Sequence, residues 1–191
     1  MISKEQIKTI ILDNQSRIYP DVWSRNLEIP LDSKKIITLS GVRRSGKTYH
    51  LFGIINKLKK QGVDGSKILY LNFEDERFVL TSNDLDLILQ SYTELFPDLK
   101  LADCYFLFDE VQEVDGWEKF VSRMYASVSQ KIFITGSNSK LLSREIATTL
   151  RGRTLTYEVY PLSFDEYLKL MFPLFNINKS KDRAKIASYF M

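Results

Sequence analysis

Apolar residues occur in two kinds of pattern along the chain. Short runs rich in β-branched and aromatic residues predict buried strands. Between these runs, apolar residues recur every three or four positions, which predicts helices with one buried face. The expected strands cover residues 36–39, 68–73, 104–108, 131–135 and 154–160. The expected helices between them cover residues 48–60, 85–96, 117–128 and 141–150.

Both ends of the chain also have helical patterns. Ser3 and Gln6 have the spacing of a capping box, so a helix is expected to begin after Ser3. Further helices are expected around residues 165–172 and from residue 180 to Met191. Because no capping residue ends the last helix, we expect the sequence to be part of a longer protein.

The alternation of strands and helices predicts the fold class. Such an order is typical of a parallel sheet that lies between layers of helices. The strand at residues 104–108 is apolar throughout, as expected when both faces of the sheet are covered. We therefore expect an α/β protein, a three-layer α/β/α sandwich with a five-stranded parallel sheet. Its expected parts are an N-terminal helical arm at 1–30, a core at 31–165 and the start of a helical lid at 166–191.

The composition is that of an ordinary globular protein, with 191 residues, of which 44% are hydrophobic and 27% charged. No apolar run approaches the roughly 18 residues of a membrane span, and the first residues are too polar for a signal peptide. A net charge of +3 does not by itself indicate nucleic-acid binding. Cys104 is the only cysteine, so we expect a buried, unreactive thiol and a reducing, cytoplasmic location.

One segment between a strand and a helix has the composition of a phosphate-binding loop. It matches the pattern G-x-x-x-x-G-K-[ST]. Its residues are Gly41, Val42, Arg43, Arg44, Ser45, Gly46, Lys47 and Thr48. The glycines allow backbone angles that turn N–H groups towards anionic oxygens, and the following helix adds its positive dipole end. An ordinary glycine turn is the alternative, but the strand before the loop and the helix after it favour phosphate binding.

Two side chains of this loop have expected roles of their own. Lys47 offers a mobile positive charge for the β and γ phosphates of a nucleotide. Thr48 offers a hydroxyl oxygen to Mg²⁺, which usually accompanies these phosphates. The loop therefore predicts nucleotide binding that depends on magnesium.

An apolar strand at residues 105–108 ends in two adjacent carboxylates, Asp109 and Glu110. Ligands of open parallel sheets bind at the carboxyl ends of the strands. Asp109 is expected to hold the hydrated magnesium ion that Thr48 also contacts, and Glu110 to orient and polarise the attacking water. A strand end with two solvated acids is the alternative, which the upstream loop makes the minority interpretation. Glu113 is a third acid nearby, but it is expected in the next loop.

Together with later motifs, these features resemble the AAA+ superfamily of P-loop ATPases. The likeness is closest to archaeal and bacterial ATPases that carry a nuclease-like domain after the ATPase core. It rests on residues 41–48, 108–112 with Trp117, 134–139, and 150–153 followed by 161–164. The resemblance implies ATP as the nucleotide, the strand order 5-1-4-3-2, a small helical lid after the core and often a further domain beyond it.

The resemblance also implies two further kinds of site residue. A polar residue after the fourth strand senses the γ-phosphate in such ATPases, and Asn138 fits this place best, with Ser137 as its rival. A simple turn is the alternative, because Gly-Ser-Asn suits turn geometry. An arginine finger lies between the fourth helix and the fifth strand, where Arg151 and Arg153 occur. A basic helix end that interacts with the helix dipole is the equal alternative for both arginines.

Other residues have more ordinary interpretations. His50, the only histidine, is expected to pack in the helix that follows the loop rather than to act in catalysis. Trp117 is expected to anchor its helix in the core. The acidic turn at residues 74–76 either binds a metal ion or a regulator, or is a solvated turn, and the solvated turn is the preferred interpretation.

The leading hypothesis is magnesium-dependent ATP hydrolysis by a domain of the AAA+ type that forms a homo-oligomer. Glu110 favours hydrolysis over a second class, a nucleotide-gated switch or scaffold that turns over rarely. A small-molecule or nucleotide kinase is less favoured, because the Asp-Glu pair and the Gly-Ser-Asn turn have no natural role there. A GTPase is disfavoured by the absence of an Asn-Lys-x-Asp motif. DNA and protein substrates both remain open, and no membrane partner is expected.

Overall fold

The computed structural model describes residues 2–21, 25, 27–136, 150, 152–172 and 179–187. Within these ranges, no helix is both long enough and apolar enough to cross a membrane. The helix expected at 141–150 lies outside the described residues, except for Leu150. All five expected strands are described, so the sheet can be compared with the prediction in full.

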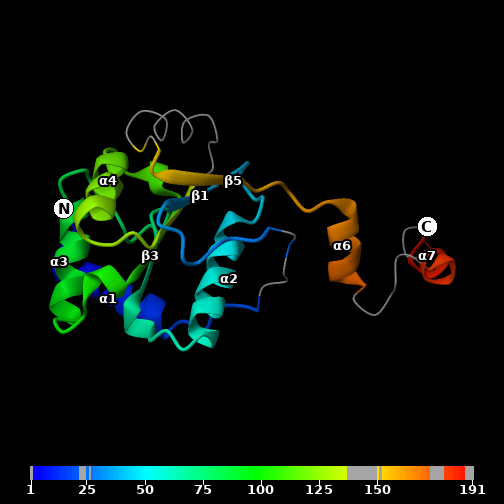
Figure 1. Cartoon of the computed structure of the whole chain (residues 1–191), viewed down its shortest axis with the longest axis horizontal. Helices are drawn as coiled ribbons and strands as arrows, with labels where there is room; N and C mark the ends of the chain where they lie inside the picture. Colours follow the sequence, from blue (N-terminus) through cyan, green and yellow to red (C-terminus); the bar gives the residue numbers. More distant parts are fainter. Residues whose placement is uncertain are drawn as a thin grey trace.

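A five-stranded, all-parallel sheet forms the centre of the protein (Figure 1). Its strands are β1 (Ile36–Ser40), β2 (Ile68–Asn72), β3 (Tyr105–Asp109), β4 (Ile132–Gly136) and β5 (Thr154–Glu158). They are arranged in the order β2-β3-β4-β1-β5. This order confirms the predicted 5-1-4-3-2 arrangement and the predicted α/β fold class.

Helices cover both faces of the sheet. They are α1 (Lys4–Ser16), α2 (Lys47–Lys60), α3 (Leu85–Leu95) and α4 (Trp117–Ser127). On one face, Phe106 and Phe108 of β3 share a buried cluster with α1, α3 and α4. On the other face, Tyr105 and Leu107 share a buried cluster with α2. Alternate side chains of β3 thus pack into two separate hydrophobic cores, one on each face of the sheet. The sandwich therefore has the three predicted layers.

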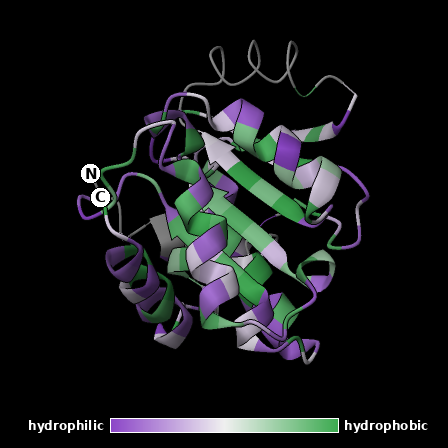
Figure 2. Ribbon diagram, turned by 90° about the vertical axis from the view of Figure 1, so that its left-hand side faces the viewer, coloured by the Kyte–Doolittle hydropathy of each residue, from purple (hydrophilic) through white to green (hydrophobic). Residues whose placement is uncertain are grey.

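Hydrophobic residues follow this layering. Figure 2 shows them concentrated in the strands and on the helix surfaces that face the sheet, with hydrophilic residues on the outer surfaces. Trp117 begins α4 and is 3% exposed in the core, as predicted. Cys104 is fully buried just before β3, and burial raises the pKa of its thiol. The predicted burial of this thiol is therefore confirmed, and its low reactivity stays a prediction.

The N-terminal helix is part of the main core. The capping box at Ser3 is formed as predicted, with Gln6 as its partner. Ile7 and Ile11 of α1 are fully buried against α3 and β2, so the helix packs on the sheet layer rather than standing apart from it. The proposed division of the chain after residues 30 and 165 stays a prediction.

The remaining elements are short. Single 3-10 turns occur at η1 (Gly65–Lys67), η2 (Leu101–Asp103) and η3 (Val111–Glu113). After β5, the chain forms α6 (Phe164–Met171) and α7 (Ser180–Ala187). Figure 1 shows α6 beyond α2, apart from the sheet. The predicted helices at the end of the chain are therefore confirmed where the structure describes them, and their first positions agree to within one residue.

Candidate active site at the carboxyl edge of the sheet

The carboxyl ends of the central strands lie side by side. Ser40 of β1 pairs with Gly136 of β4, and Asp109 of β3 pairs with Asn72 of β2. The segments that follow β1 and β3 therefore leave the sheet at one edge, where ligands of open parallel sheets bind. This edge brings the glycine loop and the acidic pair together.

The glycine loop has the backbone that its sequence predicts. A Cβ atom on Gly41 would lie 2.2 Å from the carbonyl oxygen of Val159, so only glycine allows the chain after β5 to approach. Gly46 has a φ of 98°, in the left-handed region that favours glycine, and α2 begins directly after it. Both glycines of the pattern are thus required by the structure.

Lys47 is the first residue of α2, and its side chain is almost entirely buried. Its ammonium group donates to the carbonyl oxygens of Gly41 at 3.3 Å and Val42 at 3.2 Å. The same nitrogen lies 3.3 Å from Oε1 of Glu110, with which it forms an ion pair. The predicted phosphate-binding lysine and the predicted catalytic glutamate therefore meet directly.

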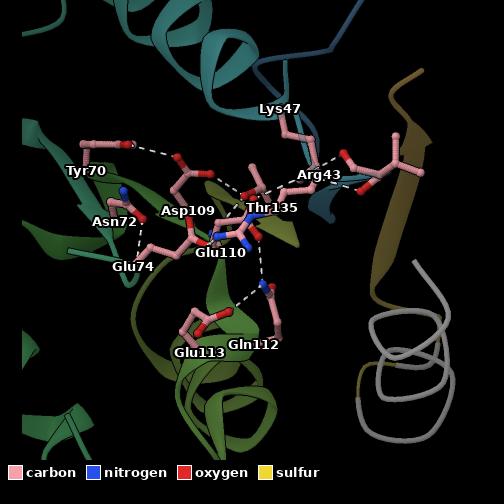
Figure 3. Close-up of polar contacts among 12 residues, drawn as sticks. Arg43, Lys47, Tyr70, Asn72, Glu74, Asp109, Glu110, Gln112, Glu113 and Thr135 are labelled. Atoms are coloured by element: carbon pink, nitrogen blue, oxygen red, sulfur yellow. Dashed lines mark hydrogen bonds and ion pairs between the residues drawn. The ribbon is translucent and has the colours of Figure 1, made fainter. Parts of the chain in front are cut away.

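Asp109 is fully buried at the end of β3. Its two carboxylate oxygens accept hydrogen bonds from the hydroxyl groups of Thr135 and Tyr70, the latter at 3.0 Å (Figure 3). Burial raises the pKa of Asp109, while hydrogen bonds from Thr135, Thr48 and Tyr70 oppose that rise. Thr48 and Asp109 therefore lie within hydrogen-bond distance of each other, while their shared contact with a magnesium ion stays a prediction.

Glu110 has a left-handed backbone, with a φ of 52°. A non-glycine residue in this region is strained, and such strain is concentrated at functional sites. Its N–H donates to Oγ1 of Thr135 at 2.9 Å, and its Oε2 accepts from Nε2 of Gln112 at 2.7 Å. Thr135 thus holds the carboxylate of Asp109 and the backbone of Glu110 at once, while the carboxylate of Glu110 contacts Lys47 and Gln112 (Figure 3).

A cavity of about 690 Å³ opens at this edge. Residues 44–48 and Glu110 form one part of its lining, and Arg25, Leu162 and Leu170 form another. Its volume is within the range of pockets that hold small molecules and cofactors. Leu162 and Leu170 form the apolar end of the cavity, towards α6, beside the charged Arg25.

Of the remaining predicted site residues, the structure describes only Arg153, and it lies away from this cavity. Arg153 precedes β5, at the amino edge of the sheet, where its Nη1 donates to Oγ of Ser122 at 2.8 Å. The length of β5 separates it from the loop of its own chain, roughly 16 Å at the usual rise per strand residue. Asn138, its rival Ser137 and Arg151 lie outside the described residues.

Some residues of the site were not anticipated from the sequence. Tyr70 and Thr135 were expected only as strand residues, and Arg25 only as part of the N-terminal arm at 1–30. Thr135 carries a weak signal, because it is a polar residue near the end of a buried strand that adjoins β3. The contact from Tyr70 spans 39 positions and that from Thr135 spans 26, and neither is visible in a local pattern.

Two residues for which no catalytic role was predicted, Glu74 and His50, lie near the loop. Glu74 forms an ion pair with Arg43 at 2.8 Å, an exposed contact between the acidic turn and the loop. His50 is partly buried in α2 and lines the same cavity. Burial is the main cause that lowers the pKa of His50, so its ring is neutral at physiological pH. Both residues belong to the surroundings of the site.

The fold and the glycine loop define a P-loop nucleotide-binding domain. More narrowly, the chain belongs to the family whose model is described as "AAA domain", which matches residues 33–168. The matched stretch contains the glycine loop, the acidic pair and all five strands. Membership of this family indicates a nucleotide-binding domain of the ATPase type.

Several curated proteins resemble the chain. Uncharacterized protein MJ1544 of Methanocaldococcus jannaschii is 44% identical over 99% of this chain and 41% of its own length. An uncharacterized protein of Haemophilus influenzae is 43% identical over 72% of this chain and 34% of its own length. Uncharacterized protein MJ1637 of M. jannaschii is 30% identical over 73% of this chain and 28% of its own length. The chain therefore spans less than half the length of these relatives.

Proposed function

We propose that the chain binds ATP together with Mg²⁺ at the carboxyl edge and hydrolyses the ATP to ADP and phosphate. The observation that carries this proposal is the meeting of Lys47 and Glu110 at 3.3 Å in the wall of the 690 Å³ cavity. A lysine that follows a glycine loop binds phosphates, and a carboxylate beside it can act on the water that attacks them. One site thus holds the groups for both binding and hydrolysis.

The loop supplies the phosphate contacts in this proposal. Its left-handed Gly46 and Arg44 shape the backbone before α2, whose N-terminus favours anions. Lys47 already faces carbonyl oxygens and a carboxylate, so phosphate oxygens can replace these partners without exposing its charge to an apolar environment. The residues 41–48 are therefore the binding residues of the proposal.

The donor set beside the loop suits magnesium. Thr48 and Asp109 supply a hydroxyl and a carboxylate that contact one another, and such hard oxygen ligands are those that Mg²⁺ prefers. We assign Thr48 and Asp109 as the residues that would hold the ion. When bound, magnesium neutralises charge on the β and γ phosphates. Tyr70 and Thr135 keep the Asp109 carboxylate in a fixed orientation for this role.

Glu110 is the proposed catalytic residue. Its carboxylate would accept a hydrogen bond from water and favour attack on the γ-phosphorus, with the proton moving towards the carboxylate. The N–H bond to Thr135 and the contact from Gln112 limit the orientations that this side chain can adopt. A fixed carboxylate positions water better than a mobile one.

A nucleotide-gated switch with little turnover is the second candidate. One observation favours it: the carboxylate of Glu110 is held by both Lys47 and Gln112. Glu110 can act on water only if ATP binding releases it from Lys47. A slow release would give tight binding with rare hydrolysis.

Steady-state phosphate release tests hydrolysis directly. Glu110→Gln is expected to keep ATP affinity and to lose turnover by about 100-fold or more, since it removes the acid–base group. Glu113→Gln is the matched control, because Glu113 is exposed and also contacts Gln112. Turnover at the parent rate in Glu110→Gln would show that another residue positions the water, with Glu113 the first to test. A parent that binds ATP without phosphate release would support the switch.

The wider setting of the domain is part of the same proposal. Residues 31–165 would form the ATPase core and residues 166–191 the start of a helical lid. Arg151 or Arg153 would act in a neighbouring subunit of a homo-oligomer, and Asn138 would sense the γ-phosphate. The lone buried Cys104 supports a cytoplasmic location. DNA or protein is the substrate class on which the ATP energy would act.

A further inference from the structure

Arg25 lies where three segments of the chain meet. It comes from the connector before β1, and its guanidinium contacts the glycine loop, the segment after β5 and the first turn of α6. We propose that Arg25 is a positioning residue that fastens α6 to the glycine loop, so that the apolar end of the cavity closes on the nucleoside half of ATP. This inference rests on the proposed function, because it concerns how the same site holds its ligand.

The contacts of Arg25 use both edges of its guanidinium. Nη1 donates to the carbonyl oxygen of Ser45 at 2.9 Å, and Nη2 donates to that of Pro161 at 3.3 Å. Nε and Nη2 donate to the two carboxylate oxygens of Glu166 at 3.1 and 3.2 Å. The two side chains are only 14% and 15% exposed. A paired, forked contact of this kind is geometrically specific, unlike an ordinary surface ion pair.

Glu166 is held in place for this contact by its own helix. Ser163 and Glu166 form the capping box of α6, in which the carboxylate accepts the N–H of Ser163 at 2.9 Å. The hydrogen bond from Arg25, followed by that from Ser163, lowers the pKa of Glu166, so it is ionised at neutral pH. One carboxylate therefore both starts α6 and ties it to Arg25.

The wall that this contact positions is apolar. Leu162 and Leu170 line the cavity from the side of α6, although they are 43% and 44% exposed. The same cavity is also lined by Lys47 and Thr48, the proposed phosphate and magnesium ligands. A nucleotide with its phosphates there would direct its base and sugar towards the leucines. Apolar side chains against a base are a common way to bind its flat faces.

His50 gives this end of the cavity a polar group. Its Nε2 is buried and has no hydrogen-bond partner among the described residues. A buried polar atom without a partner costs free energy, and a ligand that supplies the partner recovers it. A nucleobase carries both donors and acceptors at its edges, so it is a suitable ligand class for this place. The leucines and His50 thus both suit the nucleoside half of the ligand.

The test compares two ligands that share phosphates but differ in the nucleoside. ATP and inorganic triphosphate are titrated in Mg²⁺ against the parent and Glu166→Gln. The glutamine keeps the capping box, which accepts Glu or Gln, and leaves the Arg25–Ser45 contact in place. We expect ATP affinity to fall about tenfold, the scale of one lost charged hydrogen bond, with triphosphate affinity unchanged.

Two further variants sharpen the result. Glu94→Gln is the matched control, because both carboxylate oxygens of Glu94 contact lysines of α1, outside the cavity; both affinities should match the parent. Leu170→Ala removes part of the wall without touching Arg25, and should also weaken ATP alone. Melting temperatures show whether each variant is folded.

Each outcome decides the inference. Unchanged ATP affinity in either Glu166→Gln or Leu170→Ala would overturn it, as would an equal loss for ATP and triphosphate, which indicates damage to the loop. A selective loss for ATP in both variants supports it. If the parent itself binds neither ligand, the proposed function fails first, and this inference fails with it.

Discussion

Three charged side chains of the candidate site are buried at the carboxyl edge of the sheet, whereas two side chains at the amino edge lie at the protein surface. At the carboxyl edge, Lys47, Asp109 and Glu110 are 3%, 0% and 6% exposed, and they contact one another or shared partners. At the amino edge, Arg153 and Tyr125 form their hydrogen bonds to Ser122 and Lys34 at the protein surface. Of these residues, all of which the structure describes, those with buried charge lie at the carboxyl edge.

This difference indicates where the chemistry takes place. Burying a charged group costs several kcal/mol of free energy unless its partners offset that cost. Replacing a buried ion pair by apolar residues often stabilises a protein. Charged groups that are nevertheless buried together are typical of sites that bind or transform a ligand. The exposed contacts of the amino edge carry no such cost, so burial gives no sign of a ligand site of the same chain there.

The largest expected effect concerns the amino edge, where Arg153 cannot serve the loop of its own chain. If Arg151 or Arg153 is a finger for a neighbouring subunit, Arg151→Ala/Arg153→Ala should reduce ATP turnover by about 10³-fold or more. A mixing experiment tests this in a preparation long enough to assemble. The double arginine variant and the Glu110→Gln variant should each be inactive alone. Mixed assemblies of the two should recover turnover at the sites that they share.

The mixing experiment distinguishes a catalytic role of the amino-edge arginines from a purely structural one. Recovery would give the amino edge a catalytic role in trans. No recovery, despite proven co-assembly, would mean that the arginines only support the fold, in agreement with the contact to Ser122. The isolated 191-residue chain should be a weak ATPase in the first case.

The next largest effect is expected at the carboxyl edge. Lys47→Ala removes the buried charge that faces the phosphates, so ATP affinity should fall by about 100-fold or more, the scale for truncating a buried charged partner. Lys119→Ala is the control, because Lys119 is an exposed lysine of α4. Calorimetric titration in Mg²⁺ measures both. Equal affinity in Lys47→Ala and the parent would contradict the assignment of the loop.

A smaller effect compares two buried threonines. Thr135→Val removes the hydroxyl that contacts Asp109 and the N–H of Glu110, so unfolding free energy should fall by about 1–3 kcal/mol. Thr38→Val should be nearly neutral or stabilising, because Oγ1 of Thr38 is buried in β1 without a partner among the described residues. Thermal unfolding measures both variants. Equal losses of stability would show that the hydroxyl of Thr135 has no special part in holding the acids.

Local sequence predicted the parts of the site that are contiguous in the chain. The loop at 41–48 requires glycine at fixed spacing, and the pair Asp109–Glu110 follows an apolar strand, so both are visible within a few residues. The strand order was implied by the resemblance and not by local patterns, since no short segment records which strands become neighbours. The capping box of α1 was predicted because it spans only three positions.

The residues that orient the site could not be predicted in the same way. Arg25 and Glu166 are 141 positions apart, and only the packing of α6 brings them together. The capping box of Ser163 and Glu166 was not predicted, and its short spacing contains no information about Arg25. Tyr70 and Thr135 look like ordinary strand residues until the sheet places them beside Asp109. Long-range contacts therefore complete a site whose chemical groups are locally encoded.

The most direct test of the central claim is a titration of the parent protein with ATP in Mg²⁺, repeated after the metal is removed with EDTA. Saturable binding that weakens when the ion is removed is expected, because Thr48 and Asp109 then lose the cation that links them to the phosphates. Absence of saturable ATP binding in Mg²⁺ by a folded protein would contradict a nucleotide site at the carboxyl edge.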